Sequence, residues 1–130
     1  YKNLKPQLPA RSAIANSFGL YSAKDLSSWL EAISMLRNIV AHHSRLWYRI
    51  FPKKPTNLKG HRDKWLASDM TEGQKQRAFG PISALLYLCN AIFPENNIKR
   101  DILALFDAHS DIPIYQLGFT KGWRANPIWK

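Results

Sequence analysis

The sequence has little cysteine and no long apolar run, and each shortage excludes a class of protein. Cys89 is the one cysteine among 130 residues, so the chain cannot form a disulfide within itself. Its apolar neighbours indicate that it packs as a small apolar residue, which suits a reducing cytoplasm. The longest apolar stretch, residues 82–93, contains Asn90 and is shorter than the roughly 20 residues that span a bilayer. We therefore expect a soluble, cytoplasmic protein without a membrane partner.

The length limits the number of domains. A chain of 130 residues is long enough to bury a genuine core but too short for a second one. It starts with Tyr1 rather than Met, and its first residues lack the basic, apolar and small-residue layout of a signal peptide. We predict one helical domain over residues 1–130 that is a fragment of a longer protein.

Acidic residues are scarce, and the resulting positive charge lies mainly in the first half of the chain. The formal net charge is +10, from 19 basic and 9 acidic residues. Residues 1–66 contain 12 basic and 3 acidic residues, whereas the rest of the chain contains 7 and 6. Such a density of cations attracts phosphates and releases counterions. Nucleic acid is therefore the predicted partner, and the alternative is a solvated basic surface that binds nothing specific.

The spacing of apolar residues predicts an all-α fold, because no sustained alternation of apolar and polar residues favours a sheet. Helices are expected over about residues 9–18, 22–52, 72–93 and 97–109. Gly80 and Pro81 should interrupt or kink the third helix. Asn97 is the expected N-cap of the fourth. The inward face of that helix is predicted to contain Ile98, Ile102, Leu103, Leu105 and Phe106.

Two segments are expected to lie outside the main helices. Residues 52–70 form a polar, basic connector, with a short helix around residues 63–66. This connector is interpreted either as a clamp on an RNA backbone or as a solvated linker between helices. The aromatic, turn-rich tail after residue 113 should lie against the helices as irregular structure.

The second predicted helix carries a polar stripe. With about 100° per residue, Asn38, His42, Arg45 and Arg49 fall within an arc of about 60°. A guanidinium group can donate two parallel hydrogen bonds to the oxygens of one phosphate, and an imidazole can carry a proton near neutral pH. The stripe therefore has the chemistry to hold an RNA phosphodiester.

Arg37 does not join this stripe, because it lies on the apolar side, about 140° from His42. Three arrangements could still bring the two together: a long reach of the Arg37 stem, a bent helix, or a contact with the histidine of a second subunit across a symmetric interface. We favour the last. The alternative is an Arg37 paired with a carboxylate such as Glu31 or Asp107.

Outside a wider pattern, an arginine followed a few residues later by a histidine is weak evidence. His43 is expected to be packed or hydrogen-bonded inside. His61 and His109 have no metal-ligand spacing with Cys89 or with each other. No metal site is predicted.

The wider string, residues 36–49, reads Leu-Arg-Asn-Ile-Val-Ala-His-His-Ser-Arg-Leu-Trp-Tyr-Arg. It closely resembles the Arg-Asn-x-x-Ala-His-His-x-Arg-Leu-Trp-Asn-Arg segment of the Abi-like family, the AbiD and AbiF type of abortive-infection proteins. This segment is a form of the Arg-x(4–6)-His motif of the HEPN superfamily. Residues 14–20 are similar to the stretch that precedes the motif, and residues 117–119 and 127–129 to the family's ending. Tyr48 departs from the pattern, since the family usually has Asn there.

The resemblance implies a HEPN-like four-helix bundle, usually a homodimer whose motif helices meet in a composite, metal-independent ribonuclease site for phage defence. Arg37 would stabilise the scissile phosphate, Asn38 would fix local geometry and His42 would transfer the proton, with no cofactor. Family members are about twice as long, so an amino-terminal helical half is expected as a further partner.

Other residues of this segment are predicted to contact RNA without taking part in the reaction. Arg45 and Arg49 are assigned to phosphate binding, together with Lys53 and Lys54 of the basic connector. Tyr48 is interpreted either as a stacking partner for a base or as a packing residue next to Trp47.

Overall fold

The computed structural model of the chain describes residues 9–18, 20, 23–41, 54–56, 65–66, 69–111 and 113–129. In these ranges the secondary structure is entirely helical, with no strand, so the all-α prediction is confirmed. The α-helices are α1 (Pro9–Ser17), α2 (Ala23–Ala41), α3 (Glu72–Lys75), α4 (Phe79–Ile92) and α5 (Ile98–Ala108). Three short 3-10 helices follow in the tail, η1 (Ile114–Leu117), η2 (Trp123–Ala125) and η3 (Pro127–Trp129).

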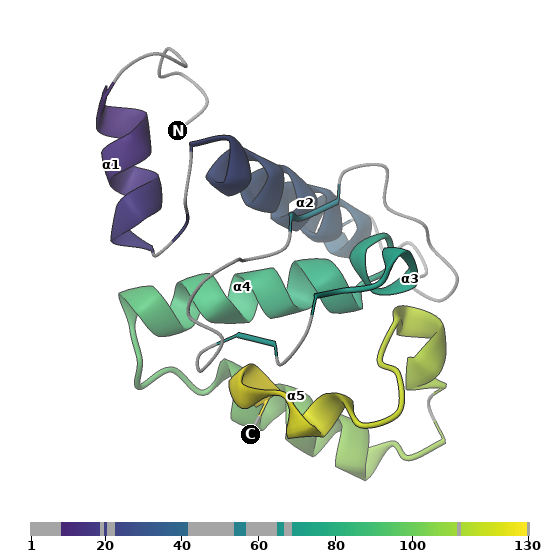
Figure 1. The fold of residues 1–130 in the computed structure, drawn as a ribbon. Helices are drawn as coiled ribbons and strands as arrows, with labels where there is room; N and C mark the ends of the chain where they lie inside the picture. The colour runs from purple at the N-terminus through teal and green to yellow at the C-terminus, as the bar shows by residue number, and fades with distance from the viewer. Residues whose placement is uncertain are drawn as a thin grey trace.

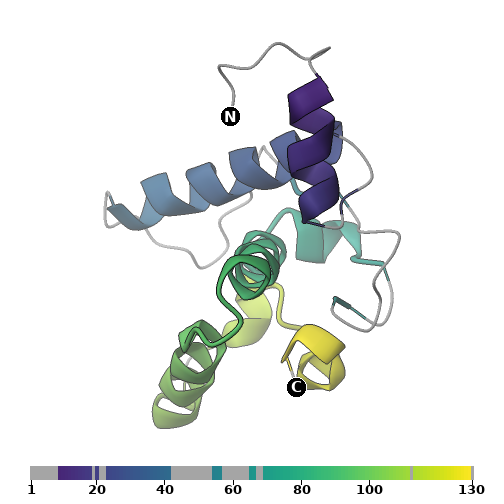
Figure 2. The same ribbon diagram turned by 90° about the vertical axis from the view of Figure 1, so that its left-hand side faces the viewer.

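Helix α4 lies at the centre of the molecule (Figure 1). Helix α2 packs on one side of it, and α1 packs in turn on α2. Helix α5 and the tail lie on the other side, which is visible in both views (Figures 1 and 2). Figure 2 shows α4 end-on with α2 running across the page, so the two helices cross at a wide angle. No helix in the described part of the chain is long and apolar enough to cross a membrane.

Two aromatic clusters form the core on either side of α4. The first joins Trp29 of α2, Trp65 of the connector and Tyr87 of α4, with the two indole rings 4.9 Å apart between centroids. The second gathers five rings from α4, α5 and the tail, namely Phe79, Phe106, Phe119, Trp123 and Trp129. Ring pairs of this kind add directional attraction to the burial of apolar area. The tail thus packs against the helices as predicted, but three short 3-10 helices take the place of part of the predicted irregular structure.

The third predicted helix is interrupted, but the prediction that the break lies at Gly80 and Pro81 is wrong. The chain breaks at residues 76–78, between α3 and α4, whereas Gly80 and Pro81 lie in the first turn of α4. A proline is tolerated there because the first N–H groups of a helix have no acceptor within it. A Cβ on Gly80 would lie 2.9 Å from the Gln74 carbonyl oxygen and 3.1 Å from that of Lys75. Glycine is therefore needed for the tight corner.

The fourth predicted helix agrees with α5 in position but not in two details. Asn97 occupies the N-cap position but makes no capping bond with its side chain. Asn96 acts instead, because its Oδ1 accepts a hydrogen bond of 3.0 Å from the Ile98 N–H. The prediction that Leu105 faces inward is wrong, since its side chain is 53% exposed. The other four residues of the predicted inward face pack against the core, so the buried face is shifted around the helix away from Leu105.

Candidate functional site

The candidate site lies on the part of the α2 surface that does not pack into the core. The buried residues of α2 are Leu26, Trp29, Ala32, Leu36 and Ile39. The middle of this face lies near Trp29 and Leu36, about 100° around the helix from Arg37. Arg37 is exposed and therefore lies at the edge of the apolar face, not within it as the sequence suggested. An arginine at this edge does not need a buried partner.

The guanidinium of Arg37 contacts the side chain that follows it. Arg37 Nη1 donates a long hydrogen bond of 3.5 Å to Asn38 Oδ1, and both residues are exposed. A guanidinium has five N–H donors, so one weak bond leaves most of them able to bind an anion. The predicted alternative of a pair with Asp107 is wrong, because Asp107 Oδ1 binds Arg124 Nη2 at 2.7 Å. Glu31 lies about 120° around α2 from Arg37, outside the spacing at which helix neighbours pair.

Four of the predicted site residues, His42, Arg45, Arg49 and Lys53, lie outside the described residues. The same holds for Tyr48 and for Ser22, where the second helix was predicted to begin. The polar stripe is therefore visible only at Asn38, which is exposed. Within the described ranges, no three His, Cys, Asp or Glu side chains gather where they could hold a metal ion.

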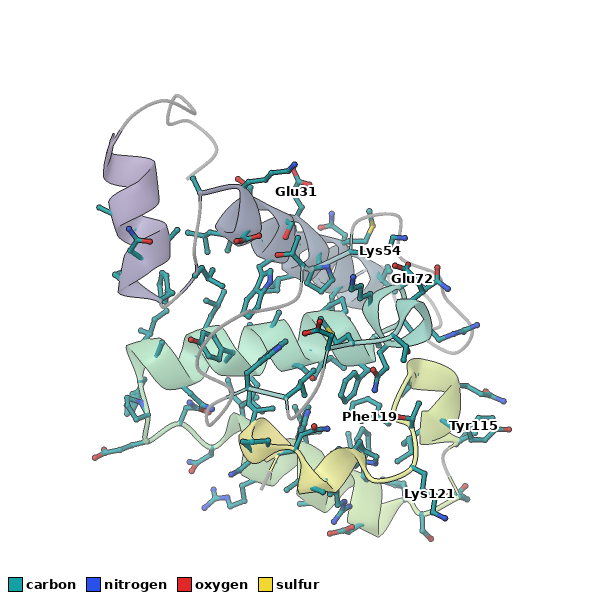
Figure 3. The ribbon with its side chains drawn as sticks, in the orientation of Figure 1. Glu31, Lys54, Glu72, Tyr115, Phe119 and Lys121 are labelled. Atoms are coloured by element: carbon teal, nitrogen blue, oxygen red, sulfur yellow. The ribbon has the colours of Figure 1, made fainter. Side chains whose placement is uncertain are left out.

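Lys54, predicted to bind RNA, is engaged with an acidic residue of α3. Lys54 Nζ lies 3.0 Å from Glu72 Oε2, and Lys75 Nζ lies 3.9 Å from Glu72 Oε1. Figure 3 shows Lys54 and Glu72 side by side next to α3. The hydrogen bond from Lys54 and its positive charge, with a smaller contribution from Lys75, lower the pKa of Glu72. Glu72 is therefore a carboxylate that competes for Lys54 with any incoming phosphate.

The connector is anchored to α2 at residues 54–56. The indole N–H of Trp29 donates to the Thr56 carbonyl oxygen at 2.8 Å, and the Thr56 N–H donates to Ser28 Oγ at 3.2 Å. The Thr56 hydroxyl donates to Asp25 Oδ1 at 3.0 Å. Pro55 is fully buried. These contacts argue against a solvated linker here, because the chain is fixed to the amino-terminal half of α2.

Further along the connector, Trp65 and Leu66 are buried and are not helical. The predicted short helix over residues 63–66 is therefore wrong at these two positions, and its first half lies outside the described residues. The Trp65 carbonyl oxygen accepts a bond of 3.0 Å from the Ile128 N–H. The connector is thus tied to the tail as well as to α2.

Sequence reasoning missed Glu72, Thr56 and a small pocket between α3 and the tail. For Glu72 a signal was present, since Thr71 and Gln74 form a capping box in which each side chain binds the other's backbone N–H. The contacts of Thr56 join residues 27 to 31 positions apart, and no local pattern predicts them. The pocket combines three separate segments, which also leaves no sequence signal.

Comparisons with known proteins bear on the amino-terminal part of the chain. The family model described as Abi-like protein matches residues 1–48. Comparison with curated proteins and with solved structures gave no match. The similarity suggested for residues 117–119 and 127–129 lies beyond the matched part. The resemblance to the Abi-like protein family is thus confirmed for residues 1–48, which include α1, α2, the Arg37–Asn38 pair and His42.

Proposed function

We propose that this protein is a metal-independent endoribonuclease of an abortive-infection defence system, built on a HEPN-like helical domain. The observation that carries the proposal is the Abi-like match over residues 1–48, because it includes the segment with Arg37, Asn38 and His42. The exposure of Arg37 and Asn38 on α2 supports it, since a scissile phosphate must approach both from solvent.

The proposed reaction needs no cofactor. The 2′-hydroxyl of the RNA attacks the adjacent phosphorus, forming a 2′,3′-cyclic phosphate while the bond to the 5′-oxygen breaks. His42 transfers a proton between these oxygens, and the Arg37 guanidinium stabilises the charge that develops on the phosphate. Asn38 fixes the guanidinium, with which it already shares a hydrogen bond. The protein's contribution is therefore positioning and electrostatics.

The site is proposed to be shared between two copies of the chain. On a regular helix, Arg37 and His42 point about 140° apart, so one helix cannot direct both at the same phosphate. Arg37 sits at the exposed edge of α2, where its long stem can extend toward a partner helix. A homodimer through α2 would pair the arginine of one protomer with the histidine of the other.

Phosphates flanking the scissile bond are assigned to Arg45, Arg49, Lys53 and Lys54. Lys54 supports this assignment in one respect, because its ammonium already binds an exposed carboxylate, Glu72. A phosphate could replace Glu72 as the partner of Lys54 with similar geometry.

The test is cleavage of labelled single-stranded RNA in the presence of EDTA. Arg37→Ala and His42→Ala should each lower the rate roughly 100-fold or more, because each removes a group that acts in the transition state. Lys24→Ala is the matched control, since Lys24 is an exposed cation in the first turn of the same helix. RNA cleavage at the wild-type rate by both Arg37→Ala and His42→Ala would rule out the ribonuclease proposal.

A non-catalytic RNA-binding module is the second candidate, and the charge distribution favours it. Residues 1–66 contain 12 basic and only 3 acidic residues, which suits a protein that holds a structured RNA. In that case Arg37→Ala and His42→Ala do not change cleavage relative to the wild type, whereas Arg45→Ala and Arg49→Ala weaken RNA binding. Binding and cleavage assays on the same four variants separate the two candidates.

A further inference from the structure

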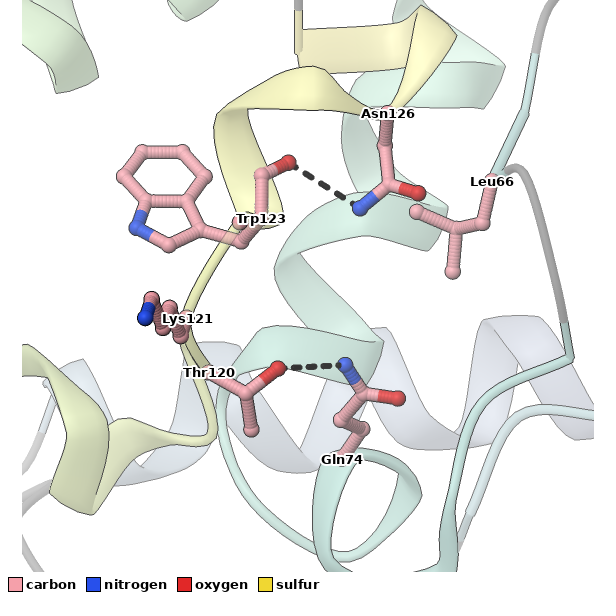
Figure 4. A pocket seen from close by; sticks show the side chains of 7 residues that line it. Leu66, Gln74, Thr120, Lys121, Trp123 and Asn126 are labelled. Carbon is pink, nitrogen blue, oxygen red and sulfur yellow. Dashed lines mark hydrogen bonds between the residues drawn. The ribbon is translucent and has the colours of Figure 1, made fainter.

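A small pocket opens between α3, the connector and the tail, away from the residues of the proposed reaction. Its volume is ≈ 180 Å³. The lining residues are Leu66, Gln74, Thr120, Lys121, Gly122, Trp123 and Asn126. Figure 4 shows these residues around the pocket, with Leu66 opposite Lys121 in this view. Apart from Leu66 and Trp123, the side chains that line it are polar.

Hydrogen bonds and close packing hold the walls in place. Gln74 Nε2 donates to Thr120 Oγ1 at 3.2 Å, and Asn126 Nδ2 donates to the Trp123 carbonyl oxygen at 3.0 Å (Figure 4). The capping box also fixes Gln74, whose Oε1 accepts from the Thr71 N–H at 2.9 Å. The tail is pressed onto this corner at Gly118, because a Cβ there would lie 3.0 Å from Phe79 Cβ. The pocket is therefore preformed.

The groups that face the pocket mainly offer donors. The oxygen of the Gln74 carboxamide is occupied by Thr71, whereas one amide hydrogen of Gln74 and the hydroxyl hydrogen of Thr120 remain for a ligand. Lys121 adds an exposed ammonium, and in the part of the chain that the structure describes no carboxylate pairs with it. A ligand rich in acceptors and negative charge suits these donors, and a phosphate diester is such a ligand.

Gly122 adds no side chain to the lining of the pocket. Gly122 has φ +82°, and no atom lies within 4 Å of a Cβ added to it. The pocket is still smaller than the roughly 300–1,000 Å³ that enclose a whole small molecule. Its size therefore favours one unit of a longer chain, and a free nucleotide would leave most of its surface outside.

The same tail carries an aromatic residue that is largely exposed to solvent. Tyr115 of η1 is 68% exposed, and Figure 3 shows its ring and the Lys121 ammonium both projecting from the tail. Aromatic side chains next to cations are a common arrangement for single-stranded nucleic acid, because every base has a face that can stack. Gln116 Nε2, at 3.4 Å from the Tyr115 hydroxyl, touches the end of the side chain and leaves the ring open.

We propose that the tail forms a second RNA contact, in which Lys121, Thr120 and Gln74 bind one backbone phosphate and Tyr115 stacks on a base. The proposal rests on the RNA substrate of the proposed function and extends it, because it assigns a contact outside the Abi-like segment. It also gives the tail a role in holding RNA that passes beyond the scissile phosphate.

The experiment measures binding of the whole chain to a short single-stranded RNA with 2′-O-methyl groups, which cannot be cleaved by 2′-hydroxyl attack. Lys121→Gln should weaken binding about threefold to tenfold near 0.1 M salt and reduce the salt slope by about 1. Tyr115→Leu should weaken binding about tenfold with an unchanged salt slope, because stacking involves no counterion release. Lys24→Gln is the matched control on α2. Thermal unfolding of each variant checks that these exposed substitutions leave the fold intact.

Affinities of Lys121→Gln and Tyr115→Leu equal to that of Lys24→Gln would overturn the proposal. The proposal would also be overturned if the protein bound inorganic phosphate or a free mononucleotide tightly, and if Lys121→Gln abolished that binding without changing RNA affinity. The pocket would then bind a small ligand. Failure here is distinguishable from failure of the ribonuclease proposal. If Arg37→Ala abolishes cleavage while Lys121→Gln binds RNA as tightly as the wild type, the tail contact alone is rejected. If Arg37→Ala cleaves normally while Lys121→Gln binds RNA more weakly, the cleavage site alone is rejected.

Discussion

The carbonyl oxygen of Thr56 accepts a hydrogen bond of 2.8 Å from the indole N–H of Trp29, a residue 27 positions earlier in the chain. Trp29 lies in the buried face of α2, so this bond satisfies a polar atom that burial would otherwise leave without a partner. It also determines where Lys54 emerges, two residues before the anchor. The position of a predicted RNA-binding lysine thus depends on a contact with the hydrophobic core.

Replacement of Thr56 by valine should destabilise the fold by about 1–2 kcal/mol, because it removes a partly buried hydroxyl that donates to Asp25. The two main-chain bonds of Thr56 would remain. Urea unfolding measures the difference, with Ser110→Ala as a control for loss of an exposed hydroxyl. Equal stability of the two variants would mean that the Thr56 hydroxyl contributes nothing beyond the main-chain contacts.

If Lys54 binds an RNA phosphate, Glu72→Gln should strengthen RNA binding, because it removes the carboxylate that competes for the Lys54 ammonium. In a Lys54→Gln background the same change should have a smaller effect, because the released cation is missing. Salt-dependent binding to uncleavable RNA in the four combinations of the two changes measures this coupling. An equal gain in both backgrounds would show that Glu72 repels RNA directly and does not act through Lys54.

The lowered pKa of Glu72 predicts how the stability of this corner depends on pH. A carboxyl whose pKa is lower in the folded state contributes stability above its unfolded value, and the contribution is lost as the pH falls through the folded value. The ordinary value is 4.5, so the loss occurs below it. The wild type should unfold at a higher temperature than Glu72→Gln at neutral pH, and this difference should disappear in acid. Glu95→Gln, at an exposed position in the turn after α4, controls for general charge effects. A difference that persists or grows in acid would contradict this assignment.

Two glycines near α3 should respond to alanine in opposite directions. Gly80→Ala should destabilise by about 1–3 kcal/mol, because its Cβ would meet the backbone oxygens of Gln74 and Lys75 at 2.9 and 3.1 Å. Gly73→Ala should be neutral or stabilise by up to about 1 kcal/mol, since its Cβ would lie 3.8 Å from the nearest atom and α3 is helical. Chemical unfolding of both variants measures this, and a Gly80→Ala protein as stable as the wild type would show that the corner relaxes freely.

The sequence predicted only those residues of the candidate site that lie in one continuous motif. Arg37, Asn38 and His42 follow from their resemblance to the Abi-like segment, and the family match covers all three. Thr56, Glu72 and the pocket residues could not be found in this way. Their relationships join α2, α3, the connector and the tail, and no spacing along the chain reports such contacts.

By itself the sequence determined where helices form and which segments are apolar, because helix periodicity, prolines and glycines act over a few residues. It therefore predicted α1, most of α5 and the packed aromatic tail. Only the tertiary structure decided which part of each apolar stripe is buried, since that depends on the neighbouring element. Packing against α4 places Arg37 at the exposed edge of α2, and packing of α5 leaves Leu105 in solvent. The anchor at Thr56 was decided in the same way, because its partners on α2 lie 27 to 31 positions earlier in the chain. The break before α4 is more local, since Gly80 lies against the backbone oxygens of Gln74 and Lys75.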